Sequence, residues 1–181
     1  MRWNGFTRSL VFAAGAAGAF PVFALFANPI LGRASALSLY LIGIAVLYVA
    51  GLTPRRSRSV AVVGIAAALG AGVFLLAPSV GTTAAGAALI VGVCRSGVLY
   101  RSRRARALVA ETCLLAGGLG LARFLAGPDT LQVAFAVWGF FLVQSFFFLL
   151  GGVAERAEPP SGLDPFEVAR ARAVALMEGD L

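Results

Sequence analysis

The sequence predicts an all-α, polytopic membrane protein with six transmembrane helices. Hydrophobic residues make up 60% of the chain, and they gather in six segments of roughly 20 residues, the length that a helix needs to cross a bilayer. Arg residues concentrate in alternate connections between these segments. Continuous runs of Ala, Gly, Leu, Val and Phe lack the alternating polarity of barrel strands. Together these observations favour helical spans.

Each segment is almost free of charge, whereas a soluble amphipathic helix carries charged residues along its wet face. The segments are taken to form one transmembrane domain over residues 1–154. The predicted helices span residues 10–27, 34–51, 59–77, 80–100, 107–126 and 130–153.

The distribution of Arg predicts the orientation. Cationic short loops stay in the cytoplasm, so three hairpins with both termini cytoplasmic are expected in the cytoplasmic (inner) membrane, and the Arg-rich composition suggests a bacterial cell. Because these Arg residues lie at membrane boundaries, anionic lipids rather than nucleic acid are the expected partners of the net charge of +7. The residues in question are Arg2, Arg8, Arg55, Arg56, Arg58, Arg101, Arg103, Arg104, Arg106 and Arg156.

The C-terminal segment differs from the rest. Residues 155–163 read as a breaker-rich linker. Residues 164–181 predict a short cytoplasmic amphipathic helix, because Asp, Pro and Glu occupy its first turn. Phe166, Leu176 and Met177 fall near one face. A short helix is marginal alone, so we expect this face to dock on the protein's own loops, the bilayer surface or a partner subunit.

Two charged residues are placed inside the predicted membrane domain. Arg95 lies six residues before Arg101, and Glu111 lies five residues after Arg106. Both are therefore about 8–9 Å deep from the same loop. An unpaired charge at that depth is costly, so a salt bridge or a shared polar cavity is expected. Snorkelling of both side chains to the head groups, or a functional relay, are the alternatives.

The other polar residues in the spans are few. Gln132, Gln144 and Ser145 are candidates for hydrogen bonds between helices. Arg123, near the outer end of its segment, is interpreted as snorkelling outward rather than as an anion site. Asp129 is expected to cap the sixth helix.

The sixth segment is bulky and aromatic, beside segments rich in small residues that permit close helix approach. Its rings are expected to face lipid or to fill grooves, or alternatively to form a docking face for another subunit or a flat hydrophobic ligand. The candidate face consists of Phe135, Trp138, Phe141, Phe146 and Phe148.

The chain contains neither His nor Lys, which removes imidazole bases, His metal ligands and Lys Schiff bases. Cys94 and Cys113 alone make a poor metal site, and no phosphate-binding loop or nucleophile elbow occurs. We therefore expect no enzyme activity, no catalytic residue, no cofactor and no metal.

These observations predict a non-catalytic membrane subunit, with an assembly, anchoring or accessory role in a larger complex. The alternative is a subunit that binds or transports a small solute. In length, helix number and orientation of the termini, the chain is similar to the substrate-binding components of energy-coupling-factor vitamin transporters, although no specific motif is shared. A minor ion or proton path is a third possibility. Such a path should place Arg95, Glu111 and Gln144 along one wetted cavity, whereas a structural subunit should bury them dry.

Overall fold

The computed structural model describes residues 5–52, 56–99 and 104–148, and every element of secondary structure in those ranges is helical. The all-α prediction is therefore confirmed for this part of the chain. The elements are α1 (Gly5–Leu31), α2 (Arg33–Leu52), α3 (Arg56–Leu76), α4 (Val80–Leu99), α5 (Arg104–Leu125), α6 (Thr130–Ser145) and the 3₁₀ turn η1 (Phe146–Phe148).

Three helical stretches in the described ranges are long and apolar enough to cross a membrane, namely α1, α2, and α6 continued through η1. Shorter apolar stretches, Val60–Leu76 and Val80–Arg95, make up most of α3 and α4. The structure thus fits a membrane protein, while the six-span topology stays a prediction. The linker at 155–163 and the tail helix with Phe166, Leu176 and Met177 lie outside the described residues.

The first helix is longer than predicted and leaves almost no connection to the second. A single residue, Gly32, separates α1 from α2, and its positive φ of 76° is a conformation that glycine adopts without steric cost. The Gly32 N–H donates to the Asn28 carbonyl at 3.0 Å, which closes the last turn of α1. Pro29 therefore lies inside the final turn of α1 and does not end the helix early.

The sixth helix also differs from its predicted range of 130–153. Regular α-helix ends at Ser145, and the next three residues tighten into the 3₁₀ turn η1. Residues 149–153 lie outside the described ranges.

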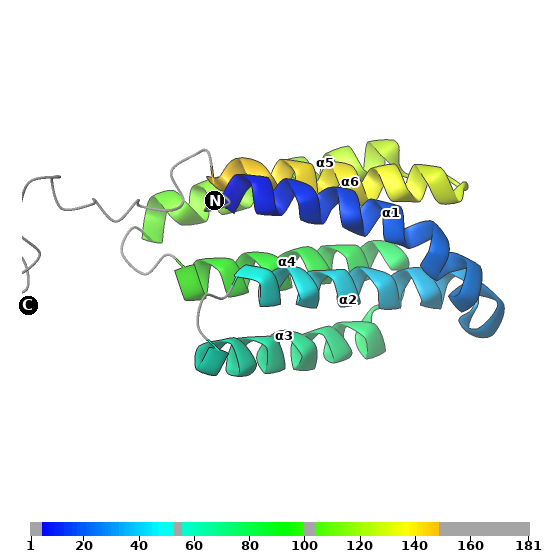
Figure 1. Cartoon of the computed structure of the whole chain (residues 1–181), viewed down its shortest axis with the longest axis horizontal. Helices are drawn as coiled ribbons and strands as arrows, with labels where there is room; N and C mark the ends of the chain where they lie inside the picture. Colours follow the sequence, from blue (N-terminus) through cyan, green and yellow to red (C-terminus); the bar gives the residue numbers. More distant parts are fainter. Residues whose placement is uncertain (1–4, 53–55, 100–103, 149–181) are drawn as a thin grey trace, which may run out of the picture.

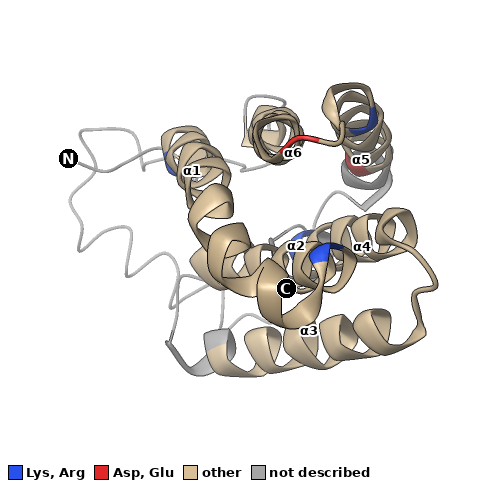
Figure 2. Ribbon diagram, turned by 90° about the vertical axis from the view of Figure 1, so that its right-hand side faces the viewer, with Lys and Arg blue, Asp and Glu red and all other residues tan. Residues whose placement is uncertain are grey.

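The helices run side by side in three layers (Figures 1 and 2). One layer holds α1, α6 and α5, the next holds α2 and α4, and α3 lies outermost. Within the described residues α3 packs only on α2 and α4. We call the end that carries the α1–α2, α3–α4 and α5–α6 connections the connection end, and the opposite end, where α1 begins, the arginine end.

The main apolar core lies between α1, α2, α4 and α6. Phe141 is its central ring, with centroids 5.1 Å from Phe12 and 5.2 Å from Tyr48. These offset and edge-on pairs add to the stabilisation from burial. Tyr40 extends the core, and its hydroxyl donates to the Ala16 carbonyl. The aromatic residues thus join α6 to both α1 and α2.

Candidate functional site

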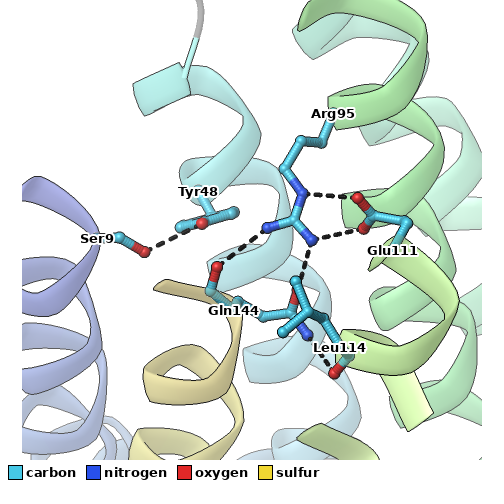
Figure 3. Close-up of polar contacts among 6 residues, drawn as sticks. All are labelled: Ser9, Tyr48, Arg95, Glu111, Leu114 and Gln144. Atoms are coloured by element: carbon cyan, nitrogen blue, oxygen red, sulfur yellow. Dashed lines mark hydrogen bonds and ion pairs between the residues drawn. The ribbon is translucent and has the colours of Figure 1, made fainter. Parts of the chain in front are cut away.

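Two charged residues inside the bundle, toward its arginine end, form a buried ion pair (Figure 3). Arg95 of α4 donates from Nε to Glu111 Oε2 at 2.9 Å and from Nη2 to Glu111 Oε1 at 2.6 Å. The Arg95 side chain is fully buried and that of Glu111 is 6% exposed. Two parallel bonds between a guanidinium and a carboxylate form one of the strongest polar contacts in proteins. The contact joins α4 to α5.

Gln144 of α6 completes this arrangement. Its side-chain Oε1 accepts from Arg95 Nη2 at 2.7 Å, and its main-chain carbonyl accepts from Arg95 Nη1 at 3.2 Å. The Gln144 Nε2 donates to the Leu114 carbonyl of α5 at 3.0 Å. Arg95 therefore makes four hydrogen bonds, close to its capacity of five N–H donors. Three helices share one saturated polar cluster.

Aromatic side chains close the cluster. The guanidinium carbon of Arg95 lies 3.8 Å from the centroid of the Phe147 ring, a favourable cation–π position. Figure 3 shows Tyr48 of α2 beside the guanidinium, and the Tyr48 hydroxyl is 3.0 Å from Ser9 Oγ of α1. We name Ser9, Tyr48, Arg95, Glu111, Gln144 and Phe147 the polar cluster; all six are buried.

Two glycines permit the helices to approach closely around the cluster. A Cβ atom on Gly92 would lie 3.1 Å from Glu111 Oε1, and one on Gly118 would lie 3.1 Å from Gln144 Nε2. Gly118, Phe147, Tyr48 and Ser9 were not expected at this site from the sequence. One available signal is helical spacing, because Phe147 lies three residues after Gln144 and so comes one turn later on the same side of the chain.

Two other polar residues of α6 do not join the cluster. Gln132 is exposed, and its Oε1 accepts from the Asp129 N–H at 3.2 Å, so it closes the start of its own helix. Ser145 is buried, but its hydroxyl donates to the Leu142 carbonyl at 2.6 Å within the same turn. Neither residue makes a hydrogen bond between helices in the described part of the chain, in contrast to Gln144.

The aromatic residues of α6 divide between surface and core. Phe135, Trp138 and Phe146 are 58%, 38% and 45% exposed. Phe141 is 2% exposed and packs against α1 and α2, so it does not belong to the candidate outer face and instead fills a groove, the other placement expected for these rings. Phe148 is half-buried and its ring covers the position where a Cβ on Gly5 would lie.

An apolar cavity of about 510 Å³ lies between α2, α4, α5 and α6. Its wall consists mainly of alanines and branched aliphatic side chains, with Phe140 and Phe141 on α6. Among the described residues that line it, Arg123 is the one that carries a charge. Arg95, Glu111 and Gln144 do not line the cavity, so the polar cluster and the cavity are separate features. No group of metal-binding residues occurs within the described ranges.

No protein-family model, curated protein or solved structure matches this chain. The interpretation of its site therefore rests on the geometry described above.

Proposed function

We propose that all six helices cross a membrane, with both termini on the cytoplasmic side. The outward-facing side chains support this, since Leu76, Phe124 and Ile30 are each more than 80% exposed and would be costly to leave in water. The charge on α5 is compatible with a span because Glu111 is paired with Arg95. The Arg-rich connections all fall at the arginine end of such a bundle.

Cysteine labelling tests this topology. In a chain whose native cysteines, Cys94 and Cys113, are replaced by Ser, a Ser79→Cys variant should react with a membrane-impermeant maleimide in intact cells. A Ser57→Cys variant should react only after lysis. The reverse pattern would place the termini outside the cell.

Binding of a small apolar solute is the function that the geometry supports best, and the cavity is the observation that carries it. A volume of about 510 Å³ falls within the range of small-molecule sites. A membrane protein that keeps such a space open is expected to fill it with an apolar occupant.

The polar cluster supports a non-catalytic role. Arg95, Glu111 and Gln144 are buried and do not line the cavity, and their side chains bond to one another and to the Leu114 carbonyl. A conducting path would instead need these groups along a wetted channel. The ion-path alternative therefore loses support. The cluster is better explained as the contact that holds α4, α5 and α6 together on the arginine-end side of a binding cavity.

Binding of decanol tests the proposal. The protein in lipid nanodiscs should be stabilised against thermal unfolding by decanol, because a ligand that binds only the folded state raises its stability. Ala84→Leu places a larger side chain in the cavity wall and should remove the effect. Ala71→Leu is the matched control on the exposed side of α3. Equal stabilisation of both variants would indicate bilayer partitioning and contradict the proposal.

A second candidate is an assembly or anchoring subunit of a larger membrane complex. Phe135 and Trp138 of α6 and Phe146, the first residue of η1, are exposed. Aromatic side chains are enriched where proteins meet. We expect a stoichiometric partner to co-migrate with the protein after mild extraction of its native membrane. That partner should be lost when the three rings are replaced by Leu, and migration alone would contradict this candidate.

A further inference from the structure

The cavity opens at the connection end. Among the described lining residues, the exposed ones are Gly81 near the start of α4 and Arg123 and Ala126 near the end of α5. The lining residues farthest toward the arginine end, Val91 and Phe141, are buried. The space is thus closed at depth and open near Arg123, which is the shape that suits a ligand with one polar end.

Arg123 has no salt bridge with a carboxylate in the described part of the chain. The other described charges at this end are Arg33, which donates to the Pro128 carbonyl, and Asp129. Two cations and one carboxylate leave the connection end with a net positive charge. On the proposed topology this is the outer side, where the positive-inside rule disfavours Arg. The position of Arg123 at the mouth of an apolar cavity therefore suggests that it has a role at the cavity itself.

We propose that the cavity binds a single-chain amphiphile with an anionic head group. The alkyl chain lies between α4, α5 and α6, and the carboxylate of the ligand is held at the mouth by Arg123, whose guanidinium matches carboxylate geometry. This inference rests on the proposed solute-binding function and adds to it the charge of the ligand. It also replaces the interpretation of Arg123 as a side chain that only snorkels outward.

A pair of probes with the same chain and different head groups tests the inference. Decanoate and decanol are titrated into the protein in nanodiscs of zwitterionic lipid, at a pH where the carboxylate is ionised, and acetate serves as the head group alone. Decanoate should bind up to about fivefold more tightly than decanol, since one exposed ion pair contributes up to ~1 kcal/mol. Acetate should not bind measurably.

Substitutions of Arg123 test whether this residue causes the preference for decanoate over decanol. Arg123→Gln should weaken decanoate binding by about the same factor and leave decanol unchanged, while Arg123→Lys should retain most of the preference. Arg123 is exposed, so neither change should prevent folding. If decanol binds and decanoate is not preferred, or if Arg123→Gln has no effect, the inference is overturned and the solute-binding function stands. If neither probe distinguishes the native chain from Ala84→Leu, both are overturned.

Discussion

One end of the bundle holds a polar contact among α4, α5 and α6, and the other end holds a cavity lined by these helices and α2. Toward the arginine end, the side chains of Arg95 on α4, Glu111 on α5 and Gln144 on α6 are joined by hydrogen bonds. Toward the connection end these three helices surround, together with α2, a cavity of about 510 Å³. Both regions are rich in small residues. Small residues therefore do not by themselves decide whether a polar contact or a cavity forms between the helices.

The lipid environment explains why a polar contact matters so much for helix association. Lipid tails are as apolar as the helix surfaces, so burial of apolar side chains gives little drive for helices to associate. A buried charge pair gives a strong one, because neither partner can be left alone in a medium of low polarity. At the connection end no such pair forms among the described residues.

The largest expected effect comes from breaking the ion pair. Glu111→Gln leaves the Arg95 guanidinium buried without its counter-charge and should lower the free energy of unfolding by about 3–5 kcal/mol. Arg95→Gln should cost a similar amount, and the double variant should lose clearly less than the sum. Reversible unfolding of the four proteins in mixed micelles measures the coupling. Additive losses would mean that the two side chains do not act as a pair.

A smaller effect is expected from crowding the cluster. In Gly92→Ala the new methyl group would meet Glu111 Oε1 at 3.1 Å and Leu115 Cδ1 at 2.9 Å. The leucine methyl can rotate away, but the carboxylate is held by two bonds to Arg95. Overpacking of this kind costs about 1–2 kcal/mol, measurable by the same unfolding assay.

Gly120→Ala is the matched control, because a Cβ there would meet nothing within 4 Å. It should leave stability unchanged or raise it slightly. Equal losses of unfolding free energy in Gly92→Ala and Gly120→Ala would show that close helix approach at Gly92 does not contribute to stability.

A neutral hydrogen bond should matter less than either change. Ser9→Ala removes the contact between Ser9 Oγ and the Tyr48 hydroxyl, which joins α1 to α2. Such bonds between membrane helices contribute on average about 0.6 kcal/mol. A double-mutant cycle with Tyr48→Phe should return a coupling energy of that size, and a value several times larger would place Ser9 among the strongest contacts of the cluster.

The smallest effect is expected at the connection end. Gln132→Ala removes the bond from the Asp129 N–H to Gln132 Oε1. Because Asp129 is exposed, water or a head group can take over the freed N–H, and the loss should be about 0.3 kcal/mol. A loss as large as that from Gly92→Ala would contradict the difference between the two ends.

Much of the fold could be predicted from local properties of the sequence. Long apolar runs predict helices in a bilayer because main-chain groups there must be paired within the segment. The helical rise also placed Arg95 and Glu111 level with each other, and the structure brings them to 2.6 Å. The end of α1 was harder to predict from the sequence. A connection was expected around Pro29, but Gly32 alone separates α1 from α2.

The tertiary structure alone decided which helix faces meet. Helical spacing places Phe135, Phe141 and Gln144 on α6 but does not say which side faces α1, α5 or lipid, since every side of the helix is apolar. The structure buries Phe141 and Gln144 and leaves Phe135 exposed. The cavity, with Arg123 among its described lining residues, likewise depends on the spacing of four helices, which is set by contacts between residues far apart in the chain.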